Sequence, residues 1–369
     1  MLEISVNILV IKIGSNIITD DGGLSQSRIN ALASDISALH STGYATVVVS
    51  SGAVAAGRSK LGIRGRIQDI NLKQAAAAVG QSSLVLAYER AFGAHGKKVA
   101  QVLLTRDAFS DRKRYINGKN TLVTLLGLNV IPIINENDTV SIDELKFGDN
   151  DSLAALVASM LDAGRLIILS DVDGLYTDDP RKNAQAVLIP TVTEITPELE
   201  ALAKGAGSIS GTGGMYSKLT AAKMATRCGI VVNIVNGRRA DLLSSVLNGR
   251  VAGTEFTPTV KRYAARKGWI ATGIRAVGTL SLDAGAVKAI TCAGKSLLPS
   301  GITSLEGEFE RGDALYCVNT EGKRIAKGLV NYSQKELQAI IGLKTDQIQA
   351  VLGYKYSDEV IHRDNMIIL

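Results

Sequence analysis

The feature that most constrains the fold is a regular alternation between short runs of β-branched residues and longer stretches with helical periodicity. Several of these runs are apolar on both faces, which is typical of buried strands in a parallel sheet. Alternation at this spacing predicts an α/β domain, in which a mostly parallel sheet is covered by helices on both faces. The predicted strands cover residues 6–13, 45–50, 98–104, 129–135, 165–170 and 230–235. The predicted helices cover residues 27–39, 71–92, 112–126, 151–161 and 217–228.

The alternation stops near residue 257, where Pro258 precedes a stretch rich in lysine and arginine. We interpret residues 259–275 as a linker. The strands predicted beyond it are short, are separated by glycines and polar turns, and lie at residues 279–282, 314–318 and 325–330. The chain is therefore expected to hold two domains, at residues 1–258 and 276–369, of which the second is smaller and mostly β.

Sequence features also restrict the class of protein. The three cysteines are widely spaced and form no CxxC pair, so neither a disulfide framework nor a zinc site is indicated. No stretch approaches about 20 uninterrupted apolar residues, as a membrane-spanning helix requires. No signal peptide is visible at the N-terminus. We expect a cytoplasmic protein without a membrane segment and without a dedicated metal site.

A lysine stands near the end of the first predicted strand, in the order Lys12-Ile13-Gly14. Glycine lets a ligand approach the backbone closely, so an ammonium group beside backbone N–H groups suits a phosphate. The alternative is a lysine that reaches solvent from a strand end and binds nothing. Lys12 and Gly14 are therefore candidate phosphate-binding residues.

Small residues follow the second predicted strand, in the order Ser50-Ser51-Gly52-Ala53. Such a turn from a strand into a helix leaves the helix N-terminus open to an anion. Ser51 is then placed to donate a hydrogen bond to a substrate carboxylate. A plain N-cap serine is the other interpretation.

Two polar clusters follow the strand predicted at residues 129–135. The first contains Asn135 and Asp138, and the second contains Asp149, Asn150 and Asp151. Asparagine amides donate and accept hydrogen bonds, which suits the ammonium and carboxylate groups of an amino acid. Acidic side chains beside lysines can hold those lysines in place. Asp151 or Asn150 could instead cap the helix that follows.

Two further loops carry motifs, and the second of them has the composition of a phosphate site. The strand at residues 165–170 leads into Ser170-Asp171, and a glycine-rich stretch at residues 211–218 opens the last predicted helix. Glycines followed by Ser-Lys at a helix start form a cradle for a phosphate with a cation beside it. An ordinary turn and a flexible surface loop are the alternatives. The candidates in the second loop are Thr212, Gly213, Gly214, Met215, Tyr216, Ser217 and Lys218.

Taken in order, these motifs resemble the amino acid kinase family over nearly the whole chain. The region from about Gly278 onward resembles the PUA module, which is otherwise best known from RNA-modifying enzymes. The resemblance implies the amino acid kinase fold followed by a PUA domain. Ser170 stands where threonine is usual in the family, and Tyr216 stands where serine or alanine is usual. The matching stretches are Lys12-Ile-Gly-Ser, Ser50-Ser-Gly-Ala-Val-Ala-Ala-Gly, Ile134-Asn-Glu-Asn-Asp, Gly148-Asp-Asn-Asp, Ser170-Asp-Val-Asp-Gly-Leu-Tyr and Thr212-Gly-Gly-Met-Tyr-Ser-Lys.

Within this family the motifs are similar to those of the members that phosphorylate L-glutamate in the first step of proline synthesis. The resemblance implies transfer of the γ-phosphate of ATP to the γ-carboxylate of L-glutamate. A carboxylate is already ionised at neutral pH, so the transfer needs no general base. Mg²⁺ is expected to be carried mainly by the phosphates, since it keeps several waters and takes few protein ligands.

The resemblance also implies roles for the candidate residues. Lys12 and Lys218 are expected to neutralise the phosphoryl oxygens, and Asp149 or Asp151 to orient these lysines. The residues expected to hold glutamate are Ser51, Asn135, Asp138 and Asn150. Those expected to hold ATP are Lys12, Gly14, Ser170, Asp171 and residues 212–218. Inhibition by proline, with a contribution from Glu144, and a homo-oligomer, either a dimer or a tetramer, are implied as well.

Other interpretations stay open on the sequence alone. Acetylglutamate, aspartate, carbamate or a nucleoside monophosphate could be the phosphoryl acceptor. The chain could also bind RNA through its C-terminal part, because residues 261–369 hold 15 basic and 11 acidic residues. Aromatic residues make up only 4% of the chain, which does not favour a surface built on base stacking.

Overall fold

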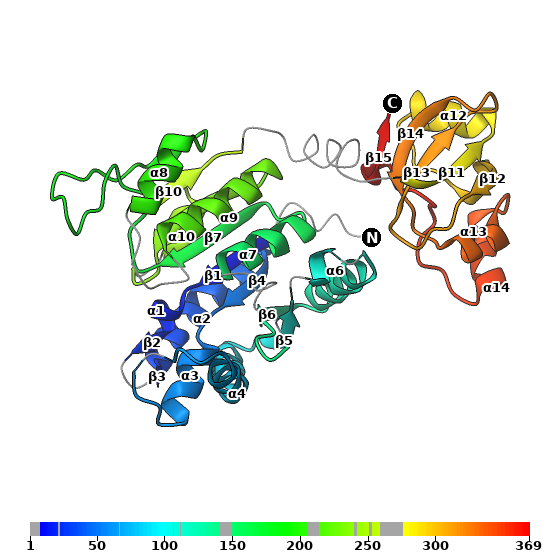
Figure 1. Cartoon of the computed structure of the whole chain (residues 1–369). Helices are drawn as coiled ribbons and strands as arrows, with labels where there is room; N and C mark the ends of the chain where they lie inside the picture. The colour runs from blue at the N-terminus through cyan, green and yellow to red at the C-terminus, as the bar shows by residue number, and fades with distance from the viewer. Residues whose placement is uncertain are drawn as a thin grey trace. The chain divides into compact units, whose positions relative to one another are not determined.

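The chain divides into two compact units, Met1–Val260 and Lys261–Leu369. The elements of both units are drawn in Figure 1. The computed structural model describes residues 8–20, 23–65, 67–105, 107–110, 112–140, 150–205, 214–239, 242–250, 253–258 and 276–369.

An eight-stranded sheet forms the centre of the first unit, with the strand order β5-β6-β4-β1-β7-β9-β10-β8. All neighbouring strands are parallel except β9 and β10. The mostly parallel α/β fold predicted from the sequence is therefore confirmed. The strands are β1 (Ile8–Ile13), β4 (Ala45–Ser50), β5 (Lys98–Leu104), β6 (Val130–Glu136), β7 (Arg165–Ser170), β8 (Thr191–Val192), β9 (Val231–Asn236) and β10 (Gly253–Phe256).

Helices connect these strands and cover the sheet (Figure 1). A two-stranded ribbon of β2 (Thr19–Asp20) and β3 (Gly23–Leu24) lies between the first two helices. The helices are α1 (Ser15–Ile18), α2 (Gln26–Ser41), α3 (Ala53–Lys60), α4 (Ile70–Gly93), α5 (Asp107–Ser110), α6 (Arg112–Gly127), α7 (Asn150–Met160), α8 (Pro197–Gly205), α9 (Met215–Arg227) and α10 (Leu242–Leu247).

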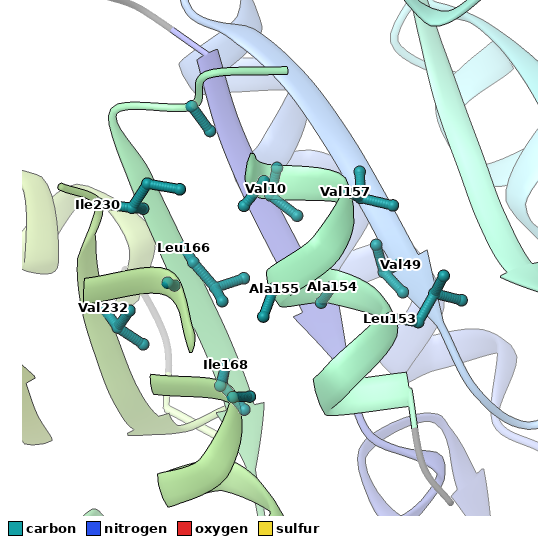
Figure 2. Packing of buried hydrophobic residues seen from close by; sticks show 14 of the residues in the cluster. Val10, Val49, Leu153, Ala154, Ala155, Val157, Leu166, Ile168, Ile230 and Val232 are labelled. Carbon is teal, nitrogen blue, oxygen red and sulfur yellow. The ribbon is translucent and has the colours of Figure 1, made fainter. Parts of the chain in front are cut away.

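The central strand β1 divides its side chains between two hydrophobic cores, because neighbouring residues of a strand point to opposite faces. Ile8 and Val10 belong to the core that contains residues of α7 and α9, which we call the α7–α9 core. Leu9, Ile11 and Ile13 belong to the core that contains residues of α2 and α4, the α2–α4 core. Figure 2 shows α7 lying across the strands with Val10, Val49 and Leu166 beneath it.

The same alternation decides where the polar side chains near the strand ends go. Lys12 follows Val10 by two positions, so it lies on the face covered by α7 and α9. Asn135 follows Ile133 by two positions, so it lies on the opposite face, the side of α4. A buried sheet thus delivers a lysine to one face and an amide to the other at the same edge.

The second unit contains a five-stranded sheet with the order β12-β11-β13-β14-β15. Its neighbours are antiparallel except β11 and β13. A hydrophobic core of its own, which includes Leu280, Leu315 and Tyr332, lies within this unit. The prediction that the second domain is the smaller one and consists mostly of β-strands is thereby confirmed. Its strands and helices are β11 (Ala276–Leu282), α12 (Ala284–Thr291), β12 (Ile302–Glu306), β13 (Ala314–Val318), β14 (Arg324–Leu329), α13 (Gln334–Ile340), α14 (Ile348–Leu352) and β15 (Met366–Ile368).

Candidate active site

The carboxyl ends of β1, β4, β6 and β7 open onto a cavity of about 830 Å³. In open parallel sheets, ligands bind beyond these strand ends, so this cavity is where a substrate site is expected. Most of the candidates named from the sequence line it. They are Lys12, Gly14, Ser51, Asn135, Asp138, Asn150, Ser170, Asp171, Gly214, Met215 and Lys218.

The charged centre of the site is a buried carboxylate between two lysines. Asp151 Oδ1 lies 2.6 Å from Lys12 Nζ, and Asp151 Oδ2 lies 3.2 Å from Lys218 Nζ. Lys12, Asp151 and Lys218 are 4%, 0% and 5% exposed, so all three charges are largely removed from water. Ser217 also donates its hydroxyl to Asp151 Oδ2 at 2.9 Å. One carboxylate therefore holds two cations that both line the cavity.

Three separate elements bring these residues together. Lys12 comes from β1, Asp151 from the first turn of α7, and Lys218 from the first turns of α9. A carboxylate in the first turn of a helix is stabilised by the positive end of the helix dipole. Burial alone would raise the pKa of the Asp151 carboxyl, but the ammonium groups of Lys12 and Lys218 outweigh burial and hold this pKa below its ordinary value of 3.8. Asp151 is therefore ionised throughout the neutral range.

The second part of the site is a cluster of amides and a hydroxyl. Asn150 Nδ2 lies 2.9 Å from Ser51 Oγ, 2.9 Å from Asn135 Oδ1 and 3.2 Å from the main-chain oxygen of Ser50. The backbone N–H of Ser51 donates to the carbonyl of Ile13 at 3.1 Å, which ties the loop after β4 to β1. Residues from three strand ends and a helix start thus converge next to the buried charges.

The turn after Ser51 depends on a glycine. Gly52 has a φ of 111°, a left-handed value that other residues rarely adopt, and it is the N-cap of α3. A Cβ at this position would also lie 3.1 Å from Ile18 Cδ1. Gly52 therefore lets the chain reverse directly from Ser51 into α3.

Close packing of α3 against α4 fixes this wall of the cavity. A Cβ on Gly57 would lie 1.7 Å from the main-chain oxygen of Ala76, and one on Gly80 would lie 1.8 Å from that of Ala53. Only glycine allows the two helix backbones to approach this closely. Helix α3, which begins directly after Ser51 and Gly52, is consequently held against α4.

The third part of the site follows β7. Ser170 Oγ donates to Asp171 Oδ1 at 3.3 Å, and Asn16 Nδ2 donates to Asp171 Oδ2 at 2.9 Å. Partial burial would raise the pKa of Asp171, but these hydrogen bonds, the Asn16 one foremost, hold it below its ordinary value. Gly214, which also lines the cavity, is the N-cap of α9, and a glycine has no side chain with which to cap the first N–H groups of this helix.

Comparisons with known proteins bear on this geometry. The sequence profile described as "Amino acid kinase family" matches residues 7–236, about three fifths of the chain. The chain belongs to the amino acid kinase family. A second profile, described as "PUA domain", matches residues 278–352 in the second unit. The resemblance and the fold class inferred from the sequence motifs are thereby confirmed.

Individual relatives in this family cover almost the entire chain. A protein named glutamate 5-kinase from Geobacter sulfurreducens is 51% identical over 362 residues, which span 98% of this chain and 97% of that protein. A glutamate 5-kinase from Myxococcus xanthus is 52% identical over 362 residues, spanning 98% of this chain and 96% of that protein. Among solved structures, carbamate kinase from Giardia lamblia bound to AMP-PNP matches with a TM-score of 0.51 and 17% identity, covering 69% of this chain and 99% of that one. At this identity the last likeness concerns the fold alone.

Some predicted site residues of this family member are placed elsewhere. Asp151 and Ser217 do not line the cavity; Ser217 donates to Asp151, whose carboxylate contacts the lining residues Lys12 and Lys218. Tyr216 is 43% exposed and does not line the cavity either. Asp149, Thr212 and Gly213 lie outside the described residues, as does Glu144.

Sequence reasoning missed several residues that line the cavity or support its lining. Asn16 orients Asp171, and Arg58, Lys73 and Arg181 add cationic side chains to the lining. Gln81 of α4 accepts a hydrogen bond from Asn135 Nδ2 at 2.8 Å. Asn16, two positions after Gly14, was within reach of motif reasoning. Gln81 was not, because it lies in the middle of a helix 54 positions before its partner.

In the described parts of the chain, none of the helices has the length and apolar character needed to cross a membrane. Within the same residues, no three His, Cys, Asp or Glu side chains are grouped so that they could hold a metal ion.

Proposed function

We propose that this member of the amino acid kinase family transfers the γ-phosphate of ATP to the γ-carboxylate of L-glutamate, the first step of proline synthesis. The observation that carries the proposal is the buried Lys12–Asp151–Lys218 cluster, which adjoins a cavity whose wall offers amide and hydroxyl groups. The names and near-complete coverage of the relatives support glutamate as the acceptor.

The reaction forms one bond and breaks another at phosphorus. An oxygen of the γ-carboxylate attacks the γ-phosphorus in line, and the bond to the β-phosphate oxygen breaks, giving γ-glutamyl phosphate and ADP. The carboxylate already carries the negative charge it needs, so no side chain has to remove a proton. The protein's tasks are to position the two anions and to neutralise their charge.

Lys12 and Lys218 carry out the neutralisation in this proposal. Both ammonium groups are buried, and a positive charge acts more strongly on a phosphoryl group in a site that excludes water. Asp151 holds the two lysines without cancelling them, since one negative charge faces two positive ones. The net charge of this cluster, +1, favours the anionic phosphoryl group.

The amide cluster would hold glutamate. Ser51 and Asn150 line the cavity and carry a hydroxyl and an amide, which suit the α-carboxylate and the α-ammonium group of an amino acid. Asp138 also lines the cavity and adds a carboxylate for the ammonium group. Asn135 accepts a hydrogen bond from Asn150 and so holds the Asn150 side chain in place.

ATP would lie on the side of β7 and α9. Gly14, Ser170, Asp171, Gly214 and Met215 line this side, and the N-terminus of α9 suits a phosphate. When bound with the nucleotide, Mg²⁺ would supply positive charge that offsets the charge of the phosphates. Asp171 lines the cavity and offers carboxylate oxygens, the ligand type that Mg²⁺ prefers, so the residues present fit the ion.

A hydroxylamine trap tests the proposal. MgATP and a candidate acceptor are incubated with the protein, ADP release is recorded, and hydroxylamine converts any acyl phosphate into a hydroxamate. We expect hydroxamate with L-glutamate and none with aspartate or acetylglutamate. ADP release without hydroxamate would contradict a carboxylate acceptor, and hydroxamate with another acid would replace glutamate as the substrate.

Four points from the sequence stay predictions. They are inhibition by proline, a homo-oligomeric state, a location in the cytoplasm, and an RNA contact of the PUA domain. A proline titration, light scattering on the purified chain, cell fractionation and a salt series of RNA binding test them in turn.

A further inference from the structure

A chain of side-chain amides runs from helix α4 to the cavity. Asn135 Nδ2 donates to Gln81 Oε1 at 2.8 Å, and Asn150 Nδ2 lies 2.9 Å from Asn135 Oδ1. Asn150 Nδ2 also lies 2.9 Å from Ser51 Oγ. Gln81, Asn135, Asn150 and Ser51 come from α4, β6, the start of α7 and the loop after β4, so four segments meet in one hydrogen-bonded row.

The main chain fixes the direction of this row. The backbone N–H of Glu136 can only donate, and it lies 2.9 Å from the Asn135 side chain, so the atom it meets is Oδ1. Asn135 therefore turns Nδ2 toward Gln81, which has to present its own oxygen. At the other end, the main-chain oxygen of Ser50 can only accept, so Asn150 turns Nδ2 toward it at 3.2 Å.

This direction decides what the cavity offers to a ligand. Ser51 Oγ accepts from Asn150, so the hydroxyl hydrogen of Ser51 is available to donate into the cavity that Ser51 lines. Asn150 uses its amino group for the protein, so its carbonyl oxygen is the atom available as an acceptor. A donor beside an acceptor complements a carboxylate beside an ammonium group, which is the main-chain end of an amino acid.

Gln81 shows a feature that packing alone does not explain. Its Nε2 is buried and has no hydrogen-bond partner among the described residues, which is an unfavourable state for an amide. An apolar side chain of the same length would avoid this cost. The glutamine is accounted for if its oxygen is needed at Asn135.

We propose that Gln81 is a positioning residue that holds the Asn135 amide in place and, through the Asn135–Asn150–Ser51 row, favours the binding of an α-amino acid. The inference rests on the proposed function in taking glutamate as the ligand. Gln81 acts on the substrate only through Asn135 and Asn150, because it does not line the cavity. Without its oxygen, Asn135 Nδ2 loses its acceptor and the Asn135 amide is held through Oδ1 alone, which loosens its contact with Asn150.

Two substitutions at Gln81 test the role. Gln81→Met keeps the length of the side chain but removes the acceptor, whereas Gln81→Glu keeps an acceptor for Asn135. We expect Gln81→Met to raise KM for L-glutamate about tenfold, since it removes a neutral hydrogen bond worth roughly a factor of ten. KM for MgATP should stay within about twofold, and Gln81→Glu should restore most of the affinity for glutamate. Gln101→Met, the same exchange at an exposed position of β5, is the matched control.

Glutarate lacks the α-ammonium group, so it distinguishes a positioning role of Gln81 from a purely structural role. The ratio of kcat/KM for glutamate to that for glutarate should fall in Gln81→Met, because the acceptor for the ammonium group is no longer held in place. A purely structural role would lower the melting temperature and change both substrates and MgATP alike, and that result would overturn the inference. If the wild type is active and Gln81→Met has the same KM for L-glutamate and the same ratio of glutamate to glutarate, the inference is overturned but the proposed function stands. A wild type that is inactive with glutamate overturns the proposed function and the inference with it.

Discussion

The buried Asp151 carboxylate is the residue on which the charged part of the site depends. It contacts the ammonium groups of Lys12 and Lys218 from its two oxygens, and it begins a helix whose dipole favours a negative charge. Removing one partner of a buried ion pair is far more costly than losing a surface pair, because the remaining charge stays buried. The two lysines differ in this respect from Asp151, since the loss of either one leaves Asp151 with the other.

The first prediction concerns Lys218. Lys218→Met removes the ammonium group but keeps an unbranched side chain, and Asp151 retains Lys12 as its partner. We expect the fold to persist and kcat to fall on the order of 10³-fold or more, as when a cation at a transferring phosphoryl group is lost. Steady-state ADP release measures this. Lys223→Met on the same helix, which removes the pair of Lys223 with Glu200, should leave kcat unchanged. A kcat for Lys218→Met within tenfold of wild type would remove Lys218 from the reaction.

The second prediction is a pH dependence of stability. The pKa of Asp151 is lower in the folded protein than its ordinary value of 3.8, so its contribution to stability is fully present above about pH 4 and is lost as the pH falls below that. At neutral pH, Asp151→Asn should lower the free energy of unfolding by about 3–5 kcal/mol. Urea unfolding between pH 3 and 7 measures the free energy of unfolding of the wild type and of Asp151→Asn. The difference in the free energy of unfolding between wild type and Asp151→Asn should shrink below pH 4. A difference that stays constant with pH would show that the two lysines do not lower the pKa of Asp151.

At the scale of helices and strands, the contact between α3 and α4 positions the amide side of the site. Gly57 and Gly80 let the two backbones touch, and Gln81 directly follows Gly80. α3 in turn begins immediately after Ser51 and Gly52. The distance between these two helices therefore controls the distance between Gln81 and Ser51, the two ends of the amide row.

The third prediction follows from this contact. Gly80→Ala places a methyl group 1.8 Å from the main-chain oxygen of Ala53, so the helices have to move apart. We expect a loss of about 1–3 kcal/mol in the free energy of unfolding, as for an overpacked core, together with a raised KM for glutamate. Gly93→Ala in the same helix is the control, because nothing lies within 4 Å of its added Cβ. That variant should gain up to about 1 kcal/mol. Equal stability of both variants would contradict the close approach.

The sequence predicted most of the parallel strands well because they are apolar on both faces, as in β1 and β7. It did not predict β8 or the antiparallel strand β10, which are short and lack a long buried run. The lysine, serine and asparagine loops could be found because they follow strand ends. Gln81 could not, since its role depends on a tertiary contact that no spacing in the sequence encodes.

At the scale of the whole molecule, the two units have separate hydrophobic cores. The α7–α9 and α2–α4 cores lie within the first unit, and the core with Leu280 and Leu315 lies within the second. Every cavity-lining residue named above also belongs to the first unit. Each unit is of a size that can fold on its own core. We therefore expect the first unit to carry out phosphoryl transfer.

The fourth prediction is that a chain ending at Val260 folds and keeps the kinase activity. We expect a cooperative thermal transition by circular dichroism, and values of kcat and of KM for glutamate within about threefold of the full chain. Residues 261–369, expressed alone, should show a separate transition, because their core does not draw on the first unit. A folded but inactive chain ending at Val260 would mean that the PUA domain contributes to the active site. An unfolded one would mean that the two cores are thermodynamically coupled, and both results would contradict the independence that their separate packing indicates.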